Sequence, residues 1–322
     1  MSIRWIALAT SLVVAASAHA LPDEVKAEYS TGSGPVDAAF SDTHRLGVVV
    51  NADASTVSLL DTAQPDGGLT SMATCADPTA VVYAGDAFVL ACGDGLLSRY
   101  AVSLGSFPAT LSSLTDIELA PVVDLTHLAA SGDDAWALSE TGWLHHVDLA
   151  TSAETGDSYY PIDLTDDLGD DDDDDSASTP TVTPVGMAAA DDGSALVVAL
   201  DDGWLFDVAL DEEGYTTTLV DTGMDDLVDV VGDGPFLLLA SDGTVMSYEA
   251  GSLSVDVLTA VTAGAGLAQA EADGSEVLLV MGDGQLTFVD PTTRASYGAV
   301  TVPDGVGVAA ATGTGAPMAV GA

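Results

Sequence analysis

The segment Leu196-Val197-Val198-Ala199-Leu200-Asp201-Asp202-Gly203-Trp204-Leu205-Phe206-Asp207-Val208 joins two apolar runs through an Asp-Gly turn. Asp-Gly between apolar runs favours a tight β-hairpin, because glycine adopts the positive φ that such a turn requires. The second run carries a short motif: glycine (serine in one copy), any residue, leucine or valine, two further residues, then an apolar or aromatic residue. The recurrence of this motif decides the fold.

Six copies of the motif follow one another along the chain. They begin at Ser55, Gly95, Gly142, Gly203, Gly243 and Gly284, so successive copies are separated by 40, 47, 61, 40 and 41 residues. An apolar run precedes each copy, and a segment rich in small residues precedes each run. A unit of four short strands repeated about every 40 residues is typical of a β-propeller blade.

We therefore predict an all-β fold, a β-propeller of about seven four-stranded blades, with six blades as the alternative. Residues 306–310 and 318–320 indicate the inner strands of a seventh unit. Residues 25–29 precede the first inner strand, and we expect them to supply an outer strand of the last blade. Such a strand closes the ring and removes exposed sheet edges.

The first repeat carries a resemblance to a known family. Residues 32–40 read Gly-Ser-Gly-Pro-Val-Asp-Ala-Ala-Phe, and the likeness continues through residues 46–51 and 56–62. This stretch resembles the YVTN-type repeat of lactonase-like seven-bladed propellers. Proteins with similar propellers include sugar lactonases, heavy chains of amine-oxidising enzymes and cell-surface binding proteins. The resemblance implies a fold and does not select among these activities.

The N-terminus has the pattern of a signal peptide. Arg4 gives a positive charge, residues 5–16 are mostly apolar, and Ala18-His19-Ala20 is a small-x-small cleavage pattern. We predict cleavage near Ala20, a secreted or periplasmic protein, and a single propeller domain over residues 21–322. No later segment has the roughly 18 uncharged apolar residues of a spanning helix, so we expect no membrane span.

The longest interval between motif copies contains an acidic insertion. Residues 170–175 are six consecutive aspartates, followed by a Ser/Thr/Pro-rich stretch. Charge repulsion and a shortage of apolar residues predict a disordered loop at about residues 165–184.

The composition is strongly acidic, with 51 Asp and Glu against 5 Lys and Arg and a net charge of −46. Such a surface repels nucleic acid and anionic lipid, so neither is an expected partner. We expect a monomer that binds an unidentified protein or extracellular ligand, with cations and basic proteins favoured by charge. Solubility in salty surroundings also accounts for the composition.

The chain has two cysteines, Cys75 and Cys92. An even pair in an exported protein favours a disulfide. Cys75 lies just before one predicted strand and Cys92 ends the next, so a hairpin brings them together.

Candidate ligand-binding residues come from two patterns. Four polar residues border or interrupt the inner strands that should line the central channel: Asp37, His127, Asp229 and Gln269. Such groups could bind a ligand or hydrogen-bond channel water. Trp143 and Trp204 share one repeat position, where paired aromatics could stack on a ligand or pack between blades. The neighbours His145 and His146 should point to opposite faces of their strand.

No recognisable catalytic set or metal site appears, so we assign no catalytic residue and leave any metal ligands unknown. Calcium is the one cofactor to consider, because Asp-Gly turns offer carboxylates, although hairpin chemistry alone explains them. Our leading hypothesis is an exported noncatalytic binding module. The alternative is a divalent-cation-dependent lactonase or other hydrolase that uses His127, Asp37 and Asp229 at the channel. A third hypothesis is an acidic surface protein that buffers cations.

Overall fold

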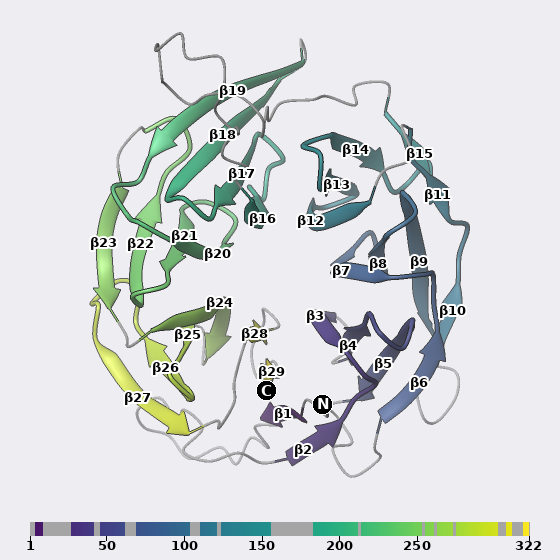
Figure 1. Ribbon diagram of the computed structural model, residues 1–322, viewed down its shortest axis with the longest axis horizontal. Coiled ribbons are helices and arrows are strands. Elements are labelled where there is room, and N and C mark those ends of the chain that lie inside the picture. Colours follow the sequence, from purple (N-terminus) through teal and green to yellow (C-terminus); the bar gives the residue numbers. More distant parts are fainter. Residues whose placement is uncertain are drawn as a thin grey trace, which may run out of the picture.

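A computed structural model of the chain describes residues 4–8, 27–41, 46–61, 69–103, 110–120, 124–155, 183–211, 214–252, 255–260, 263–272, 275–301, 307–310 and 318–321. The regular structure in these ranges is β-strand, arranged as sheets around a central axis (Figure 1). Across the same ranges, no helix has the length and hydropathy that membrane crossing requires. The predicted all-β propeller is confirmed.

Six blades are each formed by strands that follow one another in sequence and pair antiparallel. The strands nearest the axis are β3 (Pro35–Ser41), β7 (Pro78–Ala84), β12 (Leu125–Ser131), β16 (Pro184–Ala189), β20 (Leu227–Val231) and β24 (Gly264–Ala272). The second strands are β4 (Leu46–Asn51), β8 (Ala87–Cys92), β13 (Asp134–Ser139), β17 (Ala195–Leu200), β21 (Phe236–Ala240) and β25 (Ser275–Gly282). These two sets coincide with the small-residue segments and the apolar runs of the sequence.

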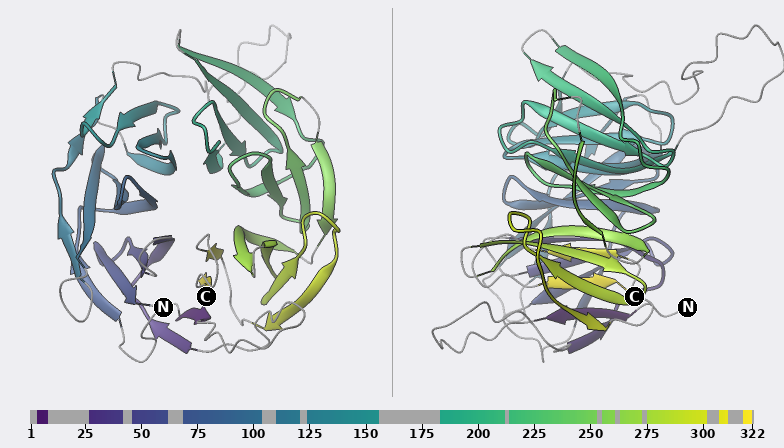
Figure 2. Two further views of the ribbon diagram at one scale, coloured as in Figure 1. Left: turned by 180° about the vertical axis from the view of Figure 1, so that it is seen from behind. Right: turned by 90° about the vertical axis from the view of Figure 1, so that its left-hand side faces the viewer.

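The repeated motif forms the third strand of each blade. These strands are β5 (Thr56–Asp61), β9 (Leu96–Ser103), β14 (Leu144–Asp148), β18 (Trp204–Asp211), β22 (Thr244–Tyr248) and β26 (Gln285–Val289). The outer strands are β6 (Leu69–Ala73), β10 (Thr110–Ser113), β15 (Ala153–Glu154), β19 (Gly214–Asp221), β23 (Val255–Ala260) and β27 (Ser296–Thr301), and β11 (Ile117–Glu118) adds a second outer pairing to β9. Figure 2 shows the blades from behind and from the side.

The two ends of the chain form a further four-stranded sheet, in the order β2-β1-β29-β28. Its strands are β1 (Arg4–Leu8), β2 (Ala27–Ser30), β28 (Gly307–Ala310) and β29 (Met318–Gly321). Strand β28 contacts β24 of the sixth blade and β3 of the first, so this sheet closes the ring. Six contiguous blades match the alternative prediction, and β2 is the outer closing strand expected from residues 25–29.

The motif's first residue turns the chain from the second strand into the third. All six first residues have positive φ, which explains the glycines; Ser55 is the exception to glycine, with a φ of 48°. At Gly203 a Cβ atom would lie 1.8 Å from the Met224 carbonyl oxygen, so this turn also approaches a neighbouring backbone too closely for a side chain. At Asp242-Gly243 the aspartate accepts a hydrogen bond from Thr244 N at 2.8 Å, which is hairpin chemistry.

The core lies between neighbouring blades. Every residue of β17 is buried, and its side chains alternate between two clusters, one shared with blade 3 and one with blade 5. Each second strand of blades 3 to 5 is sandwiched in this way, which explains why these runs are apolar without alternation. The rigid ring then holds the inner strands in place around the axis.

Cys75 and Cys92 form the predicted disulfide, with their Cα atoms 6.0 Å apart. The link joins the segment before β7 to the end of β8, as the hairpin interpretation expects. Most of the predicted acidic insertion lies outside the described residues. The described residues resume at residue 183, and β16 begins at Pro184.

Candidate functional site

The inner strand of each of the six blades contains a bulge near its start, where it has one residue more than its partner strand. The residues that follow the extra one, in blades 1 to 6, are Asp37, Ala80, His127, Gly186, Asp229 and Gly266. Three predicted channel residues therefore share one repeat position. They occupy blades 1, 3 and 5, and alternate with alanine or glycine. A β-bulge changes the direction of the side chains beside it, so the bulge is a regular structural feature of the repeat.

Asp37 and Asp229 make the same pair of contacts. Asp37 Oδ1 accepts a hydrogen bond from Ala38 N, and Oδ2 accepts one from Val81 N in the next blade, both at 2.7 Å. Asp229 does the same with Val230 N and with Leu267 N of the next blade, both at 2.8 Å. Each carboxylate thus ties its inner strand to that of the following blade.

His127 makes a related link from blade 3 to blade 4. Its Nδ1 lies 3.0 Å from Thr126 Oγ1, and the ring also bonds the backbone of Val185. The small residue at this position in blade 4, Gly186, leaves space for the inner strand of blade 5. A Cβ at Gly186 would lie 2.9 Å from Val230 N and 3.4 Å from an oxygen of Asp229. The alternation of polar and small residues therefore follows from how closely the inner strands approach.

Burial sets the protonation of these groups. It raises the pKa of Asp37 to about 6, against the opposing effect of its two backbone hydrogen bonds. Burial also raises the pKa of Asp229 to about 7, and the charge of Asp37 adds to this rise although the two lie in blades 1 and 5. Burial lowers the pKa of His127 to about 4, so this ring is neutral at neutral pH.

The alternative function needs Asp37, His127 and Asp229 to converge as metal ligands. Among the residues that the structure describes, no group of three His, Cys, Asp or Glu side chains could hold a metal ion. Asp37, His127 and Asp229 occupy the same repeat position in three different blades, and each forms a hydrogen bond with the backbone of the next blade.

Gln269 lies apart from these three. It is three residues beyond the post-bulge position of β24, toward the hairpin end of the strand. Its Nε2 donates a hydrogen bond to Glu276 Oε1 on the partner strand. The sequence hypothesis grouped Gln269 with the other polar residues, and the structure separates it because the position along the strand sets its height in the channel.

Trp204 begins the third strand of blade 4, and Trp143 lies immediately before the third strand of blade 3. Trp204 packs against the apolar cluster between these blades, which includes Trp136 and Phe206. Trp143 is partly buried, and its backbone N–H donates to Ser139 Oγ at 2.9 Å. Packing between blades, the second of the two interpretations of this pair, therefore describes Trp204.

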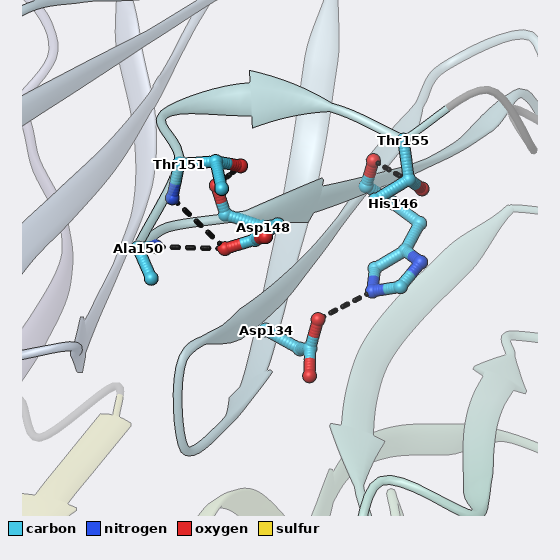
Figure 3. Close-up of polar contacts among 6 residues, drawn as sticks. All are labelled: Asp134, His146, Asp148, Ala150, Thr151 and Thr155. Carbon is cyan, nitrogen blue, oxygen red and sulfur yellow. Dashed lines mark hydrogen bonds and ion pairs between the residues drawn. The ribbon is translucent and has the colours of Figure 1, made fainter.

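His145 and His146 point to opposite faces of β14, as predicted. His145 is fully buried, with Nδ1 2.8 Å from Glu154 Oε1. His146 stacks on Trp136 with ring centroids 5.1 Å apart, and its Nε2 lies 2.7 Å from Asp134 Oδ1 (Figure 3). Beyond β14, Asp148 accepts bonds from Ala150 N and Thr151 N and shapes the turn. These contacts hold blade 3 together.

Asp207 and Tyr248 form a buried polar pair that the sequence patterns did not indicate. Asp207 is buried, and its Oδ2 accepts hydrogen bonds from Tyr248 Oη and Gly251 N in the next blade. Burial, followed by the nearby carboxylate, raises the pKa of Tyr248 above its ordinary range. An aspartate inside the apolar run of residues 204–208 was the available signal.

Acidic side chains gather at one end of the ring, in the turns that join the first strand of a blade to its second strand. The acidic rim comprises the exposed residues Asp86, Asp133, Asp192 and Asp233, from the turns of blades 2 to 5. Backbone hydrogen bonds connect neighbouring turns, from Gly85 N to Gly132 O at 3.2 Å and from Asp191 N to Asp233 O at 2.9 Å. The pKa of Asp191 is raised by burial and by Asp233. This end of the ring therefore has a concentrated negative charge.

Comparison with solved structures confirms the architecture. A chain of the crystal structure of the mitotic checkpoint complex matches with a TM-score of 0.63 and 12% identity, covering 86% of this chain and 81% of that one. PorZ, a surface component of the type-IX secretion system of Porphyromonas gingivalis, matches with a TM-score of 0.55 and 13% identity. That match covers 87% of this chain but only 34% of PorZ. At these identities the likeness shows the fold alone.

No family model matches the sequence. No curated protein matches it either. The propeller fold that the YVTN-type resemblance implied is confirmed, whereas membership of that family, or of the lactonase-like proteins, is not.

Proposed function

We propose that this protein is exported and acts as a noncatalytic β-propeller that binds a positively charged partner, a protein or another extracellular ligand. The observation that carries the proposal is the use of the channel-side polar groups. In Asp37 and in Asp229 both carboxylate oxygens accept backbone hydrogen bonds, one from the same inner strand and one from the inner strand of the next blade. Groups committed in this way serve a rigid binding scaffold better than they serve a reaction.

The charge of the molecule supports a cationic partner. A net charge of −46 attracts basic surfaces and speeds their association at low salt. The predicted signal peptide and the disulfide fit an extracellular setting. The structural neighbours, a chain of a multiprotein complex and a component of a secretion system, are compatible with a binding role. We keep the YVTN-type origin of the first repeat as part of this proposal.

The first experiment tests binding. The exported protein is immobilised, and a panel of basic and acidic extracellular proteins from its source is passed over it at low and high salt. We expect saturable binding of a basic protein that weakens as salt rises, because exposed charges are screened. Binding confined to acidic or neutral proteins would contradict the proposal.

Matched variants locate the binding face. One variant neutralises two rim residues, Asp86→Asn with Asp133→Asn, and the control neutralises two exposed residues on the outer edge of blade 2, Asp116→Asn with Glu118→Gln. Both remove the same charge. A larger loss of affinity in one of them assigns the partner to that face, whereas equal small losses indicate a diffuse electrostatic attraction.

A second experiment addresses catalysis. Lactone and ester substrates are incubated with the protein with and without calcium, and a thermal melt is followed while calcium is titrated at fixed ionic strength. We expect no turnover and a melting temperature that follows ionic strength alone. Turnover that disappears in Asp37→Asn or His127→Ala, or a saturable calcium-specific rise, would overturn the noncatalytic proposal.

A further inference from the structure

The seventh sheet has an unusual composition, because one of its two interior strands lies inside the predicted signal peptide. Strand β1 pairs with β29 on one side, with Ile6 opposite Val320, and with β2 on the other, with Ile6 opposite Glu28. Removal of residues 1–20 therefore removes β1 from between two strands that remain.

The directions of the remaining strands prevent a simple closure. β1 is antiparallel to both β2 and β29, so β2 and β29 run parallel to each other. With β1 absent, a direct pairing of β2 with β29 would be parallel, while the pairings within the six blades are antiparallel. The two strands are also separated by about two strand spacings, roughly 9–10 Å.

β2 is also held from its C-terminal side. The chain continues from Ser30 through residues 31–34 into β3 of blade 1, where Ala52 N donates a hydrogen bond to Gly34 O at 2.6 Å. A shift of β2 by a full strand spacing would pull on this connection. With β1 absent, β29 keeps β28 on one side and has one open edge, whereas β2 has no strand partner and is held near its place by this connection.

We infer that the exported protein has an open strand position between β29 and β2, which accepts an extended segment of a partner protein antiparallel to both. Strand addition of this kind takes its affinity from main-chain hydrogen bonds. The inference rests on the export proposed above, because cleavage creates the open position.

The charge of the molecule indicates which segment enters. Arg4 is the one charged residue among the first 20, so the cleaved chain keeps 51 acidic residues against 4 basic ones. A second copy of this chain would be strongly repelled, which disfavours strand exchange between copies. The expected occupant is a segment of about five residues from another protein, neutral or basic and without proline, like the strand that it replaces.

The test uses the exported protein and a peptide of residues 2–10 as the probe. The control peptide carries Ile6→Pro, which removes a backbone donor from the ladder. Hydrogen exchange is measured at residues 27–30 and 318–321. We expect the native-sequence peptide to slow exchange at both strands by about tenfold or more and the proline peptide to leave it unchanged.

A cleavage-resistant variant, Ala18→Gln with Ala20→Gln, provides the reference in which β1 stays attached. Its exchange at β29 should match that of the peptide-bound protein, and it should not bind the peptide. Equal protection of β29 in the exported protein with and without peptide would overturn the inference, because the chain would then close the position itself. A mass spectrum that still includes residues 1–20 would remove its premise, and it reports on export independently of partner binding.

Discussion

Blade 4 and the seventh sheet have the same number of strands, yet they are assembled in opposite ways. Blade 4 takes its four strands from residues 184–221, joined by successive hairpins. The seventh sheet joins residues 4–8 and 27–30 to residues 307–310 and 318–321. Local hairpins form with little loss of chain entropy, whereas pairing the two chain ends closes a loop of nearly the whole protein. Blade 4 is therefore expected to be the more robust of the two.

The largest expected effect comes from placing a proline in one strand of blade 4, compared with a proline in one strand of the seventh sheet. Val198 is fully buried in β17 and pairs with Met187 and Phe206, so Val198→Pro should cost more than about 4 kcal/mol and prevent folding. In the uncleaved chain, where β29 pairs with both β1 and β28, Ala319→Pro removes one ladder hydrogen bond and should cost about 1–2 kcal/mol. Urea unfolding followed by circular dichroism measures both. Equal losses would show that the end-closing sheet is as essential as a contiguous blade.

A second test examines the turn that makes a blade local. Gly203→Ala places a methyl group against the Met224 carbonyl, so it should cost at least about 3 kcal/mol. Gly132 also has positive φ but open space around it, and Gly132→Ala should cost about 1–2 kcal/mol. The same unfolding measurement separates the steric effect from the backbone conformation. Indistinguishable variants would mean that the neighbouring loop moves aside.

The disulfide of blade 2 links two residues of one hairpin covalently, so it too stabilises contacts that are close in sequence. Removing it with Cys75→Ala and Cys92→Ala should lower the free energy of unfolding by about 3 kcal/mol, as expected for a separation of 17 residues. A reductant should destabilise the native protein by a similar amount and leave the double variant unchanged. A loss below about 0.5 kcal/mol would show that the hairpin alone holds blade 2.

The last expected effect concerns the hydrogen bonds between inner strands, and it depends on pH. Burial raises the pKa of Asp229 to about 7 in the folded protein, so folding favours its protonated form. Stability should therefore fall as pH rises from about 4 to about 7 and then level off, by at most about 4 kcal/mol, an upper bound that the partial exposure of Asp229 to solvent reduces. Asp229→Asn should flatten this slope, measured by thermal melts at high salt.

Asp242→Asn is the matched control for that slope. Hydrogen bonding to Thr244 N lowers the pKa of Asp242, so its contribution is present above its ordinary pKa and is lost as pH falls below it. This substitution should leave the slope between pH 4 and 7 unchanged. An unaltered slope in Asp229→Asn would assign the pH dependence to Asp37, whose pKa is also raised, and to repulsion among surface carboxylates.

The candidate site was only partly predictable. The polar residues Asp37, His127 and Asp229 stood out because they interrupt runs of small residues, and they do share one position. Their partners could not be foreseen, because Asp37 reaches Val81 across 44 residues and Asp229 reaches Leu267 across 38. Gln269 looked equivalent in sequence, but a displacement of three residues along a strand moves a side chain to another level of the channel.

The sequence by itself determined the blade, since turn glycines, apolar runs and hairpin spacing act over short distances, and positive φ and strand pairing require those residues wherever the chain folds. It also determined the cysteine pair, whose partners lie in one hairpin. Only the tertiary structure decided how blades join. Which inner strand accepts a carboxylate's hydrogen bonds, and which strands meet when the chain ends close the ring, depend on the placement of one sheet against the next. Residues distant in sequence set that placement together, so no local pattern records it.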